Sequence, residues 1–188
     1  MKTALMLAGL IIAAPAVADT QYLDRVETPV VTVEGASAHQ LAERARLCII
    51  QNVTNDSVVL KDNSRVNPMF SVATMSAGDT NAVQGGDVLQ TVDLDAGLVV
   101  AHSRVQLTRM MMRHAVESTI TFEAKDGRFR IAHSGIKAAM LSTGYASNNG
   151  FQPVIVQAGS GYQKIEDALQ AVSAKIGECV VKTDNSNW

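Results

Sequence analysis

Four histidines are the residues best suited to acid–base or metal chemistry in this chain: His39, His102, His114 and His133. A metal site needs ligands clustered at short spacing, as in the H-E-x-x-H helix motif, and the sequence contains no such cluster. It also lacks a G-x-S-x-G nucleophile motif and a convincing order of Ser, His and Asp. The histidines are therefore interpreted as hydrogen-bonded or solvated side chains, and neither a metal nor another cofactor is predicted.

Two short motifs suggest ligand chemistry but favour structural interpretations. Residues 109–113 read RMMMR, and thioether sulfur suits Cu(I), yet three adjacent side chains of an extended segment cannot all face one ion. A strand-connecting loop with apolar contacts, or a flexible binding lip, explains this run better. Residues 159–161, GSG, resemble a phosphate loop before Lys164 but lack the G-x-x-x-x-G-K-[ST] spacing. A helix cap explains that motif.

Cys48 and Cys179 are the two cysteines of the chain. An oxidising compartment favours their pairing, and two separate buried thiols are the alternative. No C-x-x-C motif is present, so a redox role is not predicted. We predict a disulfide that closes a loop of about 130 residues and stabilises the fold by roughly 4–5 kcal/mol in the chain-entropy model.

The N-terminal eighteen residues have the layout of a secretory signal peptide. An apolar block over residues 4–14 is followed by Pro15 and by A-V-A at residues 16–18, which predicts cleavage after Ala18. No later stretch approaches the roughly 18–20 apolar residues that span a bilayer. We therefore expect a periplasmic or secreted protein without a membrane span.

The remaining residues, 19–188, have the usual length of a single domain. The formal net charge is −2 with mixed signs, which gives no basic footprint for nucleic acid. No nucleic-acid partner is predicted. The oligomeric state is left open.

Hydrophobic periodicity predicts the elements that position these residues. Strands are expected at residues 29–34, 88–94, 98–107, 115–124 and 128–136, and residues 53–86 form an inserted segment with one short strand near residues 58–60. A first helix starts with a capping box of Ser37 and Gln40, and a last helix runs from Ser160 to about Gly177. Cys179 then lies just beyond the last helix. For Cys48 to reach it, both helices must cover the same face of the sheet.

Residues 121–131, TFEAKDGRFRI, give the sharpest local signal. Asp126 and Gly127 are typical of a type I′ turn, so residues 122–125 should pair with residues 128–131. In that register Glu123 faces Arg130 as an exposed cross-strand pair, and the phenylalanines on both strands face the core. The charges at this tip are explained without any chemistry.

Three segments carry a resemblance to a known family: VEGAS at residues 33–37, VLQTVDLDAGLVV at residues 88–100 and FEAKDGRFR at residues 122–130. The chain resembles a bacterial exported domain of unknown function with a TATA-binding-protein-like (TBP-like) fold. The resemblance implies an α+β fold of order β-α-β-β-β-β-α, in which a curved antiparallel sheet carries two helices on one face. It brings no established activity.

The sheet face away from the helices, here called the open face, is predicted to carry a mixed polar surface. The residues expected to bind there are His102, Arg104, Gln106, Arg128 and Arg130. Our leading hypothesis is an exported, non-enzymatic binding domain for a protein, a peptide or a small envelope component. A small periplasmic enzyme or a metal carrier is the alternative, and a purely structural role is the third.

Overall fold

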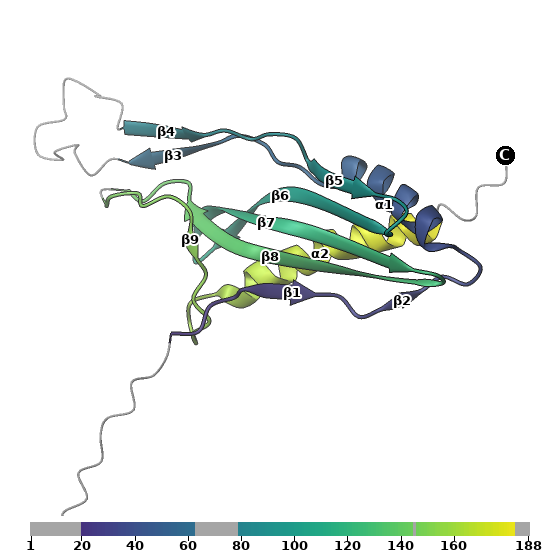
Figure 1. Ribbon diagram of the computed structural model, residues 1–188. Coiled ribbons are helices and arrows are strands. Elements are labelled where there is room, and N and C mark those ends of the chain that lie inside the picture. The colour runs from purple at the N-terminus through teal and green to yellow at the C-terminus, as the bar shows by residue number, and fades with distance from the viewer. Residues whose placement is uncertain (1–19, 63–78, 145, 183–188) are drawn as a thin grey trace, which may run out of the picture.

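The computed structural model in Figure 1 describes residues 20–62, 79–144 and 146–182. The predicted signal peptide and its cleavage site lie outside these ranges. Within them, no helix combines the length and the apolar character needed to cross a membrane.

One antiparallel sheet forms the centre of the molecule, with strand order β1-β8-β7-β6-β5. Two further short strands, β2 and β9, also pair with β8. Two-residue turns join β6 to β7 and β7 to β8, so the long central strands are neighbours in both sequence and space. The strands are β1 (Arg25–Glu27), β2 (Val31–Thr32), β5 (Leu89–Asp93), β6 (Leu98–Arg109), β7 (Met112–Lys125), β8 (Arg128–Met140) and β9 (Gln152–Pro153).

Both helices, α1 (Ala38–Asn52) and α2 (Tyr162–Lys182), pack on the same face of this sheet (Figure 1). Ile49 of α1 and Ile176 of α2 are fully buried in one apolar cluster with sheet residues. In that cluster the rings of Phe122 and Phe129 stack with centroids 5.0 Å apart. The predicted α+β class, with two helices on one sheet face, is confirmed.

The disulfide between Cys48 and Cys179 is present and joins α1 to α2. This confirms the predicted pairing, but the position of Cys179 differs from the prediction. The last helix does not end near Gly177 and instead continues to Lys182, so Cys179 lies inside it. The buried stripe continues through Ile176 and Val180, and this packing holds the helix together past its glycine.

The start of α2 also differs from the prediction. The helix begins at Tyr162, and the Ser160 hydroxyl donates a hydrogen bond to the Ile155 carbonyl instead of capping a first turn. At α1 the predicted capping box is confirmed. The Gln40 N–H donates to Ser37 Oγ (3.2 Å), and the Ser37 N–H donates to Gln40 Oε1 (3.0 Å).

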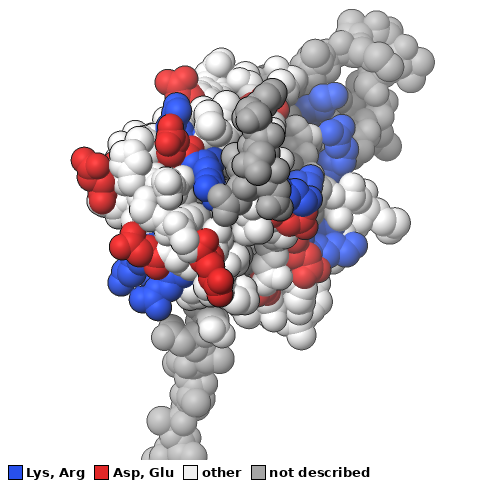
Figure 2. Space-filling view, turned by 90° about the vertical axis from the view of Figure 1, so that its right-hand side faces the viewer, with Lys and Arg blue, Asp and Glu red and all other residues white. Residues whose placement is uncertain are grey.

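The β7–β8 turn has the predicted register. Lys125 pairs with Arg128 and Glu123 with Arg130, while Gly127 takes a positive φ of 71°. Arg130 Nη2 lies 2.6 Å from Glu123 Oε2, and the hydrogen bond that Arg130 donates to the Glu123 carboxylate raises the pKa of Arg130. Acidic and basic side chains are interspersed over the face of the molecule seen in Figure 2, so no field of one sign covers it.

The same turn is attached to the start of α1. Asp126 Oδ1 accepts a hydrogen bond from the Ala38 N–H (2.9 Å), and the Gly127 N–H donates to the Ala36 carbonyl (2.8 Å). Gly127 also accepts a hydrogen bond from the Val33 N–H (2.9 Å). A carboxylate at the first turn of a helix is stabilised by the helix dipole. The turn therefore fixes where α1 begins.

The predicted strand over residues 29–34 is shorter than expected. Only Val31–Thr32 pairs there, as β2, and β1 forms a separate short strand before Pro29. Between Glu27 and Val31 the chain advances four residues while β8 retreats three, from Ala132 to Phe129. The extra residue and the missing N–H of proline interrupt the pairing.

The described part of residues 53–86 forms two strands where one was predicted. β3 (Val58–Asp62) and β4 (Asp79–Val83) form an antiparallel pair, here called the β3–β4 ribbon, and residues 63–78 are outside the described residues. Val58 and Leu60 of this ribbon pack against Ala115 and Ala139 of the sheet. The ribbon thus covers one end of the open face.

Candidate functional site

The open face does not present Arg104 as predicted. His102, Arg104 and Gln106 share one side of β6, but only 8% of Arg104 is exposed, so the expectation that it lies on an accessible surface is wrong. Arg104 is buried because it contacts the base of the β3–β4 ribbon. The position of this ribbon depends on contacts between residues that are far apart in the sequence.

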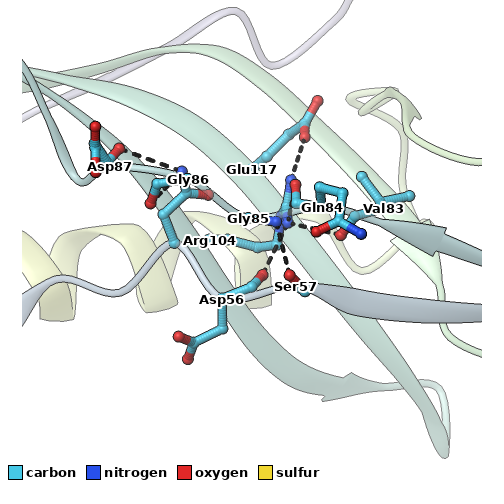
Figure 3. A network of polar contacts seen from close by, with 10 residues as sticks. Asp56, Ser57, Val83, Gln84, Gly85, Gly86, Asp87, Arg104 and Glu117 are labelled. Carbon is cyan, nitrogen blue, oxygen red and sulfur yellow. Dashed lines mark hydrogen bonds and ion pairs between the residues drawn. The ribbon is translucent and has the colours of Figure 1, made fainter.

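Arg104 connects the sheet to the base of this ribbon (Figure 3). Its Nη1 donates to the carbonyls of Asp56 (2.8 Å), Gln84 (3.3 Å) and Val83 (3.4 Å). Its Nη2 lies 3.5 Å from Glu117 Oε2, and its guanidinium carbon lies 5.3 Å from the centroid of the Phe151 ring. These contacts give Arg104 a structural role in holding the ribbon on the open face.

We expect Arg104→Ala to lower the free energy of unfolding by about 2–3 kcal/mol. The substitution removes the charged donor from the backbone carbonyls that now accept its hydrogen bonds, and leaves those carbonyls without this partner. Amide hydrogen exchange at Val58 and Leu60 should accelerate as the ribbon loosens. Arg128→Ala is the matched control: this arginine is exposed, and its loss should change stability by less than about 0.5 kcal/mol. Equal stability of the two variants in urea titrations would contradict the structural role of Arg104.

The other predicted open-face residues do not converge on one site. His102 and Arg104 line a polar hollow of about 350 Å³ with Glu117 and Lys137. Arg128 and Arg130 line a separate hollow of about 240 Å³, and the exposed Gln106 accepts a hydrogen bond from Arg113. A binding role for these residues stays a prediction. Among the described residues, no group of three His, Cys, Asp or Glu side chains could hold a metal ion.

A larger hollow lies on the helix-covered side of the sheet, between α2 and the β1–β2 edge. This α2 groove has a volume of about 860 Å³. Apolar side chains from β8 and small residues from α2 form its walls, and polar groups lie among them. The lining residues are Glu27, Thr28, Pro29, Val31, Phe129, Ile131, Gln170, Ser173, Ala174, Gly177, Glu178, Val181 and Lys182.

The groove results from the residues that α2 turns toward β8. Ser173, Ala174 and Gly177 are small, so this stretch of the helix does not fill the space in front of the strand edge. Gly177 lies close enough to Phe129 that an added Cβ would be 3.8 Å from the ring. Lys182 lines the groove and forms an exposed ion pair with Glu178 at 3.3 Å.

One groove residue, Ser173, belongs to a buried polar cluster. Its Oγ lies 2.9 Å from His133 Nε2, and the Ser118 Oγ lies 3.0 Å from His133 Nδ1. His133 is fully buried, and its burial lowers the pKa to about 4, although a backbone hydrogen bond to Leu169 partly opposes this shift. The imidazole is therefore neutral at pH 7, and both of its ring nitrogens have partners.

The fold resembles solved bacterial structures. A TBP-like protein from Parabacteroides distasonis ATCC 8503 superposes with a TM-score of 0.53 at 10% sequence identity, covering 87% of this chain and 94% of that one. The fold is TBP-like. A DUF4468 family protein from Bacteroides ovatus ATCC 8483 gives a TM-score of 0.48 at 12% identity, with 87% and 89% of the two chains covered. No family model and no curated protein sequence matches the chain.

Sequence reasoning placed the binding surface on the open face of the TBP-like sheet and missed the α2 groove. Phe129 was predicted to face the core, which is confirmed, but its role with Ile131 in lining a hollow was not foreseen. The available signal was the group of small residues at 173, 174 and 177. Such spacing on a helix also fits close packing against a strand, so it could not identify a hollow by itself.

Proposed function

We propose that this chain is an exported, non-enzymatic binding domain of the bacterial cell envelope that holds the acyl chain of a small envelope component in the α2 groove. The observation that carries the proposal is the groove itself. Its volume of about 860 Å³ falls within the roughly 300–1,000 Å³ typical of small-molecule sites, which are mostly apolar with a few polar groups. The disulfide supports an oxidising compartment.

The neighbouring strand edge favours an acyl chain over a peptide. A bound peptide strand would need free main-chain donors and acceptors along β1 and β2. Pro29 offers no N–H, the register shifts beside it, and Arg25 and Glu27 form an exposed ion pair on β1. Charges, proline and irregular pairing are features that protect a strand edge from added strands. A ligand held by apolar contacts does not pair with the strand edge, so the charges, the proline and the irregular pairing do not hinder it.

The polar groups of the groove suit the head of such a ligand. Lys182 can pair with a carboxylate or phosphate, because its existing ion pair with Glu178 is exposed and therefore weak. Gln170 adds an amide on the same helix.

One observation favours the alternative of an enzyme, namely the buried contact between the groove residue Ser173 and His133. A general base works best when its pKa is near the working pH, and the pKa of His133 is lowered to about 4. The ring is also engaged on both sides by hydroxyl groups. The cluster is better explained as satisfaction of buried polar groups.

The proposal is tested by titrating the protein with the fluorescent fatty acid cis-parinaric acid. The wild-type chain should bind with saturation, and Ala174→Trp should weaken binding at least about tenfold because the indole occupies the groove. Ala171→Trp is the matched control, since Ala171 is exposed on the same helix but does not line the groove. It should bind like wild type.

Three outcomes would overturn the proposal. If the wild-type chain shows no saturable binding, or if the two tryptophan variants lose binding equally, the groove is not the site. Turnover of an acyl ester that is abolished by Ser173→Ala would replace the binding domain with an enzyme.

A further inference from the structure

The turn between β6 and β7 consists of two methionines. Arg109 pairs with Met112 at the strand ends, so Met110 and Met111 are the turn residues, with φ of 50° and 63°. A two-residue turn with positive φ at both positions is type I′. This turn favours Asn and Gly, because most other residue types are strained at positive φ.

The same sheet shows what an unstrained turn of this kind looks like. The β7–β8 turn has Asp126 and Gly127, the residue types that the conformation favours. Met110 and Met111 are the only non-glycine residues with positive φ in the described part of the chain. Strain of this kind persists where the surrounding structure imposes it and is concentrated at functional positions.

Packing within the molecule does not explain the methionines. Met111 is 97% exposed, Met110 61% and Met112 43%. They form an apolar tip, here called the methionine tip, at the end of the long β6–β7 hairpin. An exposed and strained apolar group contributes nothing to folding, so its contribution must be sought outside the chain.

Two cations flank the methionine tip. Arg113 is exposed and donates to Gln106 (2.8 Å), and the Arg109 side chain lies against the loop before α2, where a Cβ at Gly161 would be 3.0 Å from Arg109 Cγ. Neither arginine forms an ion pair with a carboxylate among the described residues. The tip is therefore apolar at its end and positive at its base.

We propose that the methionine tip inserts into the surface of a membrane that contains anionic phospholipid. Unbranched apolar side chains beside arginines suit the boundary between acyl chains and anionic headgroups. Methionine adapts its shape to irregular surroundings. The tip is too small for a stable protein interface, which buries about 800 Å² on each partner, whereas a lipid surface requires no matching shape.

The test is co-sedimentation of the full chain with phosphatidylglycerol or phosphatidylcholine vesicles. Wild type should partition onto phosphatidylglycerol, and the double variant Met110→Asn, Met111→Gly should lose at least about tenfold in partition coefficient while melting at a higher temperature. Arg113→Gln should weaken binding to phosphatidylglycerol only. Every variant keeps the same N-terminal segment, so differences between them report the changed residues alone.

Leu47→Gln is the control, because it removes another exposed apolar side chain, 45% exposed, from α1, away from the tip. It should bind vesicles like wild type. The proposal fails if wild type does not bind phosphatidylglycerol, or if the double variant binds as well as wild type. A stoichiometric Cu(I) complex that needs the methionines, without vesicle binding, would assign the tip to metal binding instead. None of these outcomes depends on the α2 groove.

Discussion

Replacing both Cys48 and Cys179 by alanine should lower the free energy of unfolding by about 5 kcal/mol, the largest single effect that we expect. The bond joins residues 131 apart in sequence, and cross-linking over so long a loop removes much of the conformational entropy of the unfolded chain. Domains of this size are stable by only about 5–15 kcal/mol, so the variant should be close to unfolding at 37 °C. Urea titrations of both proteins measure the difference.

A reduced wild-type protein is the natural comparison for this variant. Dithiothreitol should bring the wild type to nearly the same midpoint as the alanine variant, because the packing of the helices is otherwise unchanged. Ala42→Ser, a small change at a buried position on α1, controls for disturbance of the helix contact alone. A loss below about 1 kcal/mol on reduction would show that the bond adds little to stability.

Acidification should destabilise the fold through His133. The folded-state pKa is lowered to about 4 from the ordinary 6.5, so between these values the unfolded chain binds a proton that the folded chain does not. Stability is therefore complete above about pH 6.5, falls as the pH drops and has lost roughly 3 kcal/mol near pH 4. The physical cause is the cost of placing a charge in a site with no exposure to water.

Two measurements check this acid sensitivity. The His133 ring should titrate near pH 4 by NMR, and urea midpoints should decrease between pH 7 and pH 4. His133→Gln keeps a polar side chain between Ser118 and Ser173 but cannot titrate, so its stability should depend less on pH over this range. If both proteins lose stability in parallel, other groups are responsible.

Local chemistry made part of the fold predictable. The turn at Asp126 and Gly127 sets the β7–β8 register from four residues alone, and Ser37 with Gln40 marks the start of α1. The β6–β7 connection was predicted as a longer loop because Met110 and Met111 contradict the usual chemistry of the tight turn that they form. The strand signal was correct in that region, but the turn signal was absent.

Features that depend on distant contacts were not predictable. Arg104 looks like any exposed residue of an alternating strand, and its burial follows from carbonyls at positions 56, 83 and 84. The α2 groove is a gap between elements at opposite ends of the chain, and no local pattern specifies a gap. The continuation of α2 past Gly177 likewise depends on packing that overrides the usual stop signal.

The attachment of the β7–β8 turn to α1 has a consequence for the order of folding. A hairpin with a two-residue loop closes within microseconds, whereas Ala38 and Asp126 are 88 residues apart and must meet by closing a long loop. The Asp126 carboxylate and the Gly127 carbonyl accept hydrogen bonds from the start of α1 and from the residues before it. Both groups are correctly placed only after the turn has formed. We therefore expect the β7–β8 hairpin to form first. The first helix precedes the hairpin in the sequence, but it should dock on the hairpin turn later in folding.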